Sequence, residues 1–111
     1  MRYLLILFAA SAALAQAPQQ HSVTLNWQDT ANPTGTTYSV YRATGLCSGT
    51  PTFNKVATGV ATKSYQDTTV QPGNYCYQVT ATANSVESAP SNTALAPVPS
   101  FAPAQLTVTV Q

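Results

Sequence analysis

The sequence predicts an all-β protein that folds as a sandwich of two sheets. Apolar and polar residues alternate in short runs, and turn-forming residues separate these runs about every ten residues. Helical periodicity is absent outside the N-terminal apolar stretch. Short alternating strands at such regular spacing are typical of a β-sandwich, in which each sheet buries one face.

Residues 1–15 have the features of an export signal. Arg2 supplies positive charge, an apolar stretch from Tyr3 to Leu14 follows, and small residues suited to signal peptidase come next. The stretch is too short to span a bilayer. We expect cleavage after Ala15, because the alternative site two residues later would place Pro18 directly behind the scissile bond. The remaining chain would be secreted, extracellular or periplasmic, without membrane contact.

The exported chain carries very little charge. Charged residues make up 6% of the sequence, against roughly 25% in ordinary soluble domains, and without Arg2 the basic and acidic residues balance. A neutral chain lacks the electrostatic footprint of a nucleic-acid partner. A single domain of this size has little stability to spare, so a covalent link would help it.

Cys47 and Cys76 are the only cysteines. An oxidising compartment favours their pairing, and the chain-entropy treatment of a closed loop of about 30 residues gives roughly 3.5 kcal/mol. The rival interpretations are a reactive thiol or two metal ligands. His21 is the only other soft ligand, too few for a closed zinc site. We therefore predict a disulfide, no metal and no cofactor.

Four strands are predicted between the export signal and residue 67. They are a run through Val23, Leu25 and Trp27, then Thr37–Ala43, Phe53–Ala57 and Lys63–Asp67. Residues rich in Gly, Pro, Asn and Ser predict the turns between them, at Asp29–Gly35, Gly45–Thr52 and Gly59–Thr62.

The longest predicted strand, Asn74–Ala83, follows a Pro-Gly turn. Its alternation places Tyr75, Tyr77 and Val79 on the buried face and Cys76 on the other. If Thr37–Ala43 pairs antiparallel with it, Cys47 in the next loop can reach Cys76. The predicted core residues are Trp27, Tyr38, Val40, Tyr75, Tyr77 and Val79.

The C-terminal part predicts two further strands. Asn84–Ser91 reads as a turn and Asn92–Ala96 as a strand. Residues 97–104, with three prolines, form a stiff extended spacer. Residues 105–111 close the chain as an alternating strand, in which Leu106, Val108 and Val110 share one face.

Four segments together resemble the fibronectin type III family, particularly its bacterial secreted form. They are HSVTLNW from His21, TYSVYRAT from Thr37, TKSYQDTTV from Thr62 and VQPGNYCYQVTATANSVESAPSN from Val70. The resemblance implies an immunoglobulin-like sandwich within residues 16–96. It also implies that Trp27 is the core tryptophan of the family's second strand and that Tyr75 is the tyrosine corner, whose hydroxyl bonds to nearby backbone.

The chain departs from the family at both ends. The family's first strand is missing, because only Gln16–His21 precede the tryptophan strand, and the strand 105–111 is surplus. The tail could begin a second domain, fold back onto its own sandwich, or complete the sandwich of a neighbouring molecule. Folding back in the usual direction requires the spacer to cross the domain, whereas the other direction reverses the usual pairing. Repeated donation between molecules would build a filament.

The sequence contains no pattern that indicates catalysis. Asp29, Asp67 and Glu87 fall at turns or strand ends, and His21 stands alone as a strand-edge residue. The paired carboxylates of a glycosidase and the common hydrolase and nucleotide motifs are missing. Four aromatic residues could form a sugar-stacking platform, although we expect them to pack in the core: Tyr41, Phe53, Tyr65 and Phe101.

The sequence therefore favours a non-enzymatic secreted module for extracellular binding, adhesion or structural spacing. Its expected partner is an extracellular protein or a carbohydrate. The alternative function is a self-assembling filament subunit, whose C-terminal strand completes a neighbour. By analogy with the family, the recognition surface would lie on the loops Asp29–Gly35 and Asn84–Ser91, which share one pole of the fold.

Overall fold

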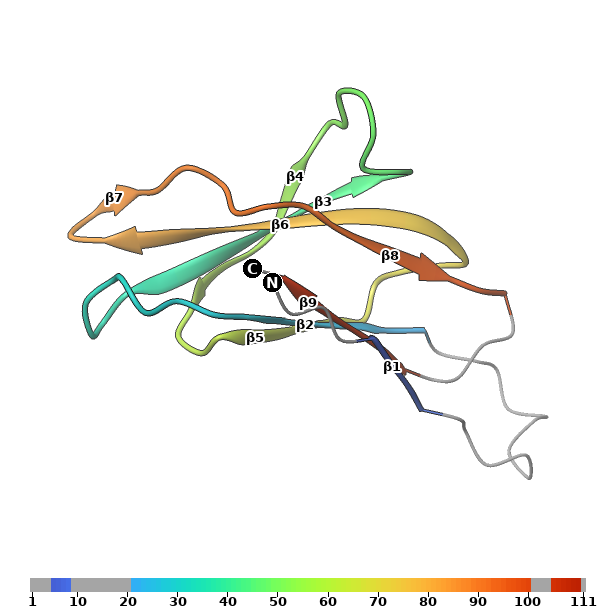
Figure 1. Cartoon of the computed structure of the whole chain (residues 1–111), viewed down its shortest axis with the longest axis horizontal. Coiled ribbons are helices and arrows are strands. Elements are labelled where there is room, and N and C mark those ends of the chain that lie inside the picture. Colours follow the sequence, from blue (N-terminus) through green and yellow to red (C-terminus); the bar gives the residue numbers. More distant parts are fainter. Residues whose placement is uncertain (1–4, 9–20, 101–104, 111) are drawn as a thin grey trace.

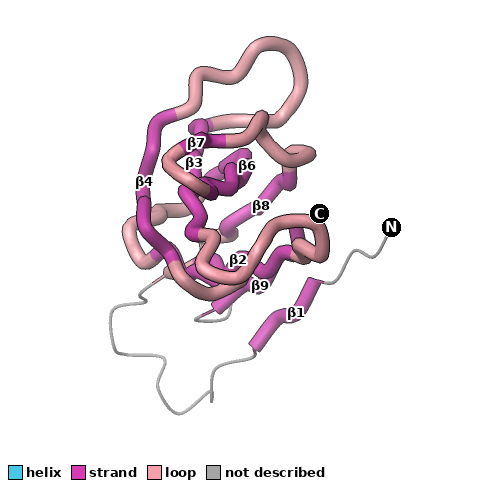
Figure 2. The backbone as a smooth tube through the Cα atoms, turned by 90° about the vertical axis from the view of Figure 1, so that its left-hand side faces the viewer, coloured by secondary structure: helices cyan, strands magenta, loops and turns pink. Residues whose placement is uncertain are grey.

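The computed structural model describes residues 5–8, 21–100 and 105–110, which form nine strands in two sheets without a helix. The first sheet has the order β1-β9-β2-β5, and the second the order β4-β3-β6, with β7 and β8 both beside β6 (Figure 1, Figure 2). The bounds are β1 Leu5–Phe8, β2 Val23–Trp27, β3 Thr37–Thr44, β4 Asn54–Val60, β5 Ser64–Asp67, β6 Gly73–Ala83, β7 Val86–Glu87, β8 Ala94–Val98 and β9 Gln105–Val110. The predicted all-β architecture of two sheets is confirmed.

The first sheet contains both ends of the described chain. β2 pairs antiparallel with β5 and parallel with β9, and β9 pairs antiparallel with β1. Leu25 of β2 lies between Tyr65 of β5 and Val108 of β9 in this register. The C-terminal strand thus lies on its own sandwich. Leu5–Phe8, part of the predicted export signal, forms β1, whereas the rest of that signal lies outside the described residues.

The second sheet is built on the long antiparallel pair β3 and β6, whose register runs from Thr37 opposite Thr82 to Thr44 opposite Tyr75. β6 continues into β7 through a two-residue turn, in which Asn84 and Ser85 have φ values of 51° and 64°. This backbone is that of the tight turns whose twist matches a hairpin.

Three predicted boundaries in this sheet were wrong. β4 ends at Val60 and so includes the first two residues of the predicted turn Gly59–Thr62, because Gly59, at φ 68°, lies at an irregularity where the register with β3 shifts. β7 lies inside the predicted turn Asn84–Ser91. β8 runs to Val98, so Pro97, predicted in the spacer, lies opposite Asn74 of β6. A proline is tolerated there because β8 pairs on one side only.

The core lies between the sheets, and all six predicted core residues are buried in it. The rings of Trp27 and Tyr38 meet edge to face, with centroids 5.4 Å apart and planes at 63°. β9 contributes the fully buried Val108 and Val110. Among the described residues, no helix is long and apolar enough to cross a membrane.

The predicted disulfide between Cys47 and Cys76 is confirmed, with a Cα–Cα separation of 5.2 Å. Cys76 lies on β6 opposite Ala43, close to the end of β3, and Cys47 follows in the next loop. The bond fastens that loop to the sheet and leaves Cys76 without exposed surface. A disulfide fits an oxidising extracellular or periplasmic environment.

Candidate functional site

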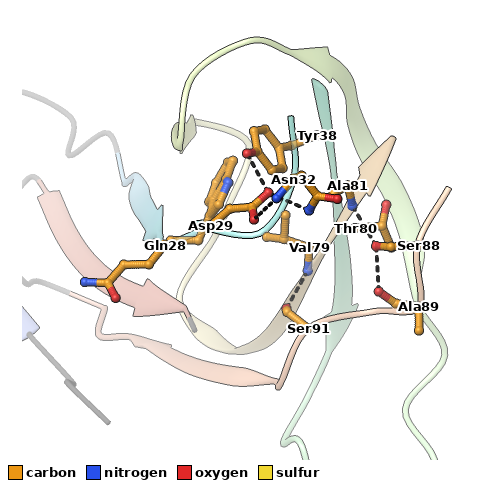
Figure 3. A pocket seen from close by; sticks show the side chains of 11 residues that line it. Gln28, Asp29, Asn32, Tyr38, Val79, Thr80, Ala81, Ser88, Ala89 and Ser91 are labelled. Atoms are coloured by element: carbon orange, nitrogen blue, oxygen red, sulfur yellow. Dashed lines mark hydrogen bonds between the residues drawn. The ribbon is translucent and has the colours of Figure 1, made fainter. Parts of the chain in front are cut away.

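A pocket of about 180 Å³ opens at one end of the sandwich, between the loop that follows β2 and the segment that follows β7 (Figure 3). Gln28, Asp29 and Asn32 line one side, and Ser88, Ala89 and Ser91 line the other. The two loops predicted to share a pole therefore border the same pocket.

Asp29 organises the first side of the pocket. Its Oδ1 accepts hydrogen bonds from the backbone N–H groups of Ala31 and Asn32, at 3.1 and 3.2 Å. Its Oδ2 accepts from the Asn32 amide at 2.7 Å and from the Tyr38 hydroxyl at 2.9 Å (Figure 3). This is the local bonding for which short acids are favoured in turns.

The same hydrogen bonds determine the charge of Asp29. The bond from the Asn32 side chain, with those from Tyr38 and the backbone, outweighs the cost of desolvation and lowers the pKa of Asp29 to about 2. Desolvation and the neighbouring carboxylate raise the pKa of Tyr38. Asp29 is therefore ionised at neutral pH, and its two oxygens accept hydrogen bonds from its own loop and from Tyr38 on β3.

Two serines organise the second side. Ser88 donates its N–H to the carbonyl of Ala81 at 2.7 Å, and its Oγ accepts the N–H of Ala81 at 3.0 Å (Figure 3). Ser91 makes the same two bonds with Val79: its N–H donates to the Val79 carbonyl at 2.8 Å, and its Oγ accepts the Val79 N–H at 3.0 Å. Serine hydroxyls thus replace the carbonyls of a regular strand beside β6, and strand geometry resumes only at Ala94.

Trp27 lines the pocket with an unused donor. Its side chain is 6% exposed, and its Nε1 is buried without a hydrogen-bond partner in the described part of the chain. Leaving such a donor unpaired costs about 1–3 kcal/mol. Tyr38, Val79 and Ala81 line the pocket beside it. The pocket thus has an aromatic and apolar lining beside an ionised carboxylate, and Trp27, one of the lining residues, carries an unpaired N–H.

Asp67 and Arg42 form an ion pair that the sequence did not predict. The Arg42 guanidinium donates to Asp67 at 2.8 Å, and Asp67 also accepts from the Tyr77 hydroxyl at 2.7 Å and from Thr69. Burial disfavours ionisation of Asp67, but the bonds from Thr69, Tyr77 and Arg42 outweigh it and lower its pKa. The pair joins β3 to β5 across the sandwich. The register of the structure places Arg42 directly opposite Tyr77, which also bonds to Asp67.

Glu87 joins residues on the other face of the second sheet. It accepts hydrogen bonds from the hydroxyls of Tyr41 at 2.5 Å and Thr80 at 2.6 Å, which lower its pKa. The ammonium of Lys55 lies 5.6 Å from the centre of the Tyr41 ring. These contacts join β3, β4, β6 and β7 on one surface.

The described residues do not form the aromatic platform that the sequence left open as an alternative to core packing. Tyr41 lies on β3 in one sheet, whereas Tyr65 lies on β5 in the other and packs against the core. Phe53 precedes β4, and Phe101 lies outside the described residues. His21 is half-buried before β2. Within the described ranges, no group of three His, Cys, Asp or Glu residues could hold a metal ion.

Comparison with models of known protein families finds no match to this chain, and comparison with curated proteins finds none either.

Proposed function

We propose that this chain is a secreted, non-enzymatic module of the fibronectin type III type that binds an extracellular ligand in the pocket beside Trp27. Two contacts support the family assignment. Trp27 of β2 packs on Tyr38 in the core, and the hydroxyl of Tyr75 accepts the N–H of Gln71, four residues earlier, at 2.9 Å. A tyrosine bonded back to the backbone a few residues upstream is the corner of this sandwich class.

The N-terminal departure from the family has a counterpart in the sheet. The position beside the tryptophan strand, which the family's first strand occupies, holds β9 from the other end of the chain. β9 runs parallel to β2, which reverses the family's pairing. β9 thereby occupies the sheet position that the first strand holds in the family. This supports the proposal that residues 16–111 act as one module.

The unpaired Nε1 of Trp27 is the observation that carries the binding proposal. A ligand oxygen that accepts this N–H would recover the free energy lost by leaving it unpaired. The ionised Asp29 at the rim disfavours anions, and hydroxyls of Ser88 and Ser91 line the same pocket. We therefore infer a neutral glycan. Because Nε1 has no exposed surface, the ligand reaches it only if side chains of the pocket lining move aside.

The test is a titration followed by ¹H–¹⁵N spectroscopy. Trp27 is the only tryptophan, so the protein has a single indole N–H signal. The probes are cellohexaose and N-acetylchitohexaose, two neutral glycans of which only the second carries amide carbonyls. We expect a saturable shift of the indole signal with at least one probe. An indole signal that neither probe moves would contradict the proposal.

Two matched variants locate the binding. Ala89→Leu fills the pocket with a larger side chain at an exposed position, and we expect it to abolish the shift. Ala31→Leu makes the same change at an exposed alanine outside the pocket lining, and we expect binding to persist. Loss of binding in both variants, or in neither, would contradict this location.

A second candidate function is a filament subunit assembled by strand donation. It is favoured by β9, whose Val108 and Val110 are fully buried in the core. A segment that contains prolines connects β9 to β8. Such a strand could fill the equivalent place in a neighbour instead of the place in its own molecule. Deletion of residues 105–111 should then abolish large assemblies in size-exclusion chromatography, and added QLTVTVQ peptide should bind the truncated chain. Assemblies that survive the deletion would contradict donation.

A further inference from the structure

The edges of the two sheets differ in how they are protected from pairing with another chain. Natural proteins protect a sheet edge with short strands, charges, prolines or bulges. β4 carries Lys55 and the irregularity at Gly59, and β8 carries Pro97. β5 has four residues and β7 has two.

β9 has none of these protections. It is six residues long, contains neither charge nor proline, and keeps an unbroken register with β2. Its outer edge is covered by β1, whose four residues pair antiparallel with it, from Leu5 opposite Val108 to Phe8 opposite Gln105. Figure 2 shows β1 at the margin of the molecule, beside β9. Among the described strands, the one long edge without such protection is thus covered by β1, Leu5–Phe8.

Removal of the export signal would uncover this edge. β1 lies within residues 1–15, which the sequence predicts to be cleaved. Without β1, the outer N–H and C=O groups of β9 have no strand partner among the described residues, and such a row of groups is a template for another strand. This step rests on the predicted signal and not on the ligand proposed for the pocket.

We propose that the uncovered edge of β9 pairs with the same edge of a second copy of this chain, in antiparallel orientation. β1 demonstrates that the edge accepts an antiparallel strand. Two copies related by a twofold axis place β9 against β9 in that orientation. Each copy then uses the same edge, so no edge is left for a third copy. The product is a dimer with one sheet continuous across both molecules, and it differs from the open filament that strand donation builds.

The composition of β9 fits a second copy as its partner. The strand has no charge, so two copies do not repel each other when they lie side by side. Thr107 and Thr109 alternate with the buried Val108 and Val110, and threonines form favourable pairs across antiparallel strands. Val108 and Val110 stay in their own core, so each sandwich remains complete.

The test compares two forms of the protein by sedimentation equilibrium. One is the exported form, with its N-terminus determined by mass spectrometry, and the other is the uncleaved chain of 111 residues. We expect the processed form to dimerise and the uncleaved chain to be monomeric at the same concentration, since β1 occupies the edge. A monomeric processed form, or exported protein that retains residues 5–8, would overturn the proposal.

Charged variants at Thr109 identify the edge. Thr109→Lys and Thr109→Glu each place like charges near the interface, and we expect each to weaken the dimer at least about tenfold. An equimolar mixture of the two should restore association. The matched control is Gln66→Lys on β5, the opposite edge of the same sheet, which should leave the dimer intact.

Two outcomes would overturn the edge assignment. A dimer that survives Thr109→Lys indicates that two molecules exchange β9, because exchange keeps the buried valines in place. A dimer that is lost in Gln66→Lys indicates a contact through β5. Circular dichroism and thermal melting of each variant show that it is folded. The indole titration with the glycan probes reports separately on the pocket, because β9 does not line it.

Discussion

The guanidinium of Arg42 on β3 and the carboxylate of Asp67 at the end of β5 form a 2.8 Å ion pair that joins the two sheets. The Asp67 side chain is 1% exposed, and it also accepts the hydroxyl of the fully buried Tyr77. A charge in this position depends on its partner, because removal of one member leaves the other uncompensated.

Arg42→Met should therefore lower the free energy of unfolding by about 2–4 kcal/mol, since it leaves the Asp67 carboxylate buried without its cation. Urea denaturation measures the effect. Lys55→Met is the matched control, because Lys55 is exposed and its ammonium lies by the Tyr41 ring and near the exposed Glu87, so its loss should cost less than about 0.5 kcal/mol. Equal effects of the two substitutions would contradict a structural ion pair.

Tyr75→Phe should lower the free energy of unfolding by about 1 kcal/mol, because it removes the acceptor of the Gln71 N–H and keeps the buried ring. Thermal melting and urea denaturation both measure it. Tyr65→Phe serves as the control, since the Tyr65 hydroxyl makes no hydrogen bond with the described residues. An unchanged melting temperature for Tyr75→Phe would count against the corner assignment.

Removal of the disulfide should lower the stability by an amount comparable with the loss of the ion pair. The double variant Cys47→Ala/Cys76→Ala releases a loop closed over a sequence separation of 29, for which the loss is roughly 3.5 kcal/mol on the chain-entropy account. Denaturation of the oxidised protein, the reduced protein and the double variant gives the comparison. Reduced protein that is as stable as oxidised protein would refute this contribution.

Acid should destabilise the fold through Asp29. Its pKa is about 2 in the folded chain, below the ordinary 3.8, so the unfolded state binds more protons between these values. Stability from this group is present above about pH 4 and is lost as the pH falls towards about 2. Asp67, whose pKa is also lowered, contributes with the same sign.

Melting temperatures at pH 5 and at pH 2.5 test this expectation. Asp29→Asn removes the titrating group, so the fall in melting temperature between the two pH values should be smaller than in the natural chain. A fall of equal size in both proteins would show that Asp29 contributes nothing to acid sensitivity.

Local patterns predicted the strands better than their ends. The alternation through Val23, Leu25 and Trp27 indicated β2, because burial of one face is a property of a single strand. The ends of β4 and β8 were misplaced because Gly59 and Pro97 are turn-forming residues that a bulge and an edge strand also accept.

The pocket could be anticipated only as a pair of loops at one pole. Its unpaired indole was invisible in the sequence, since a buried Trp27 finds or lacks a partner according to what surrounds its Nε1. The serine bonds to β6 were equally hidden, because Ser88 and Ser91 read as turn residues.

The sequence by itself determined the strand faces, the disulfide between the two available cysteines and the alternation of the last strand. Only the tertiary structure decided that β9 lies parallel to β2, that Arg42 meets Asp67, and that β1 covers the β9 edge. The physical reason is the separation along the chain of the residues that interact. A period of two residues specifies which side chains of a strand share a face, whereas the neighbour of that strand depends on which buried surface remains open and on which segment can reach it.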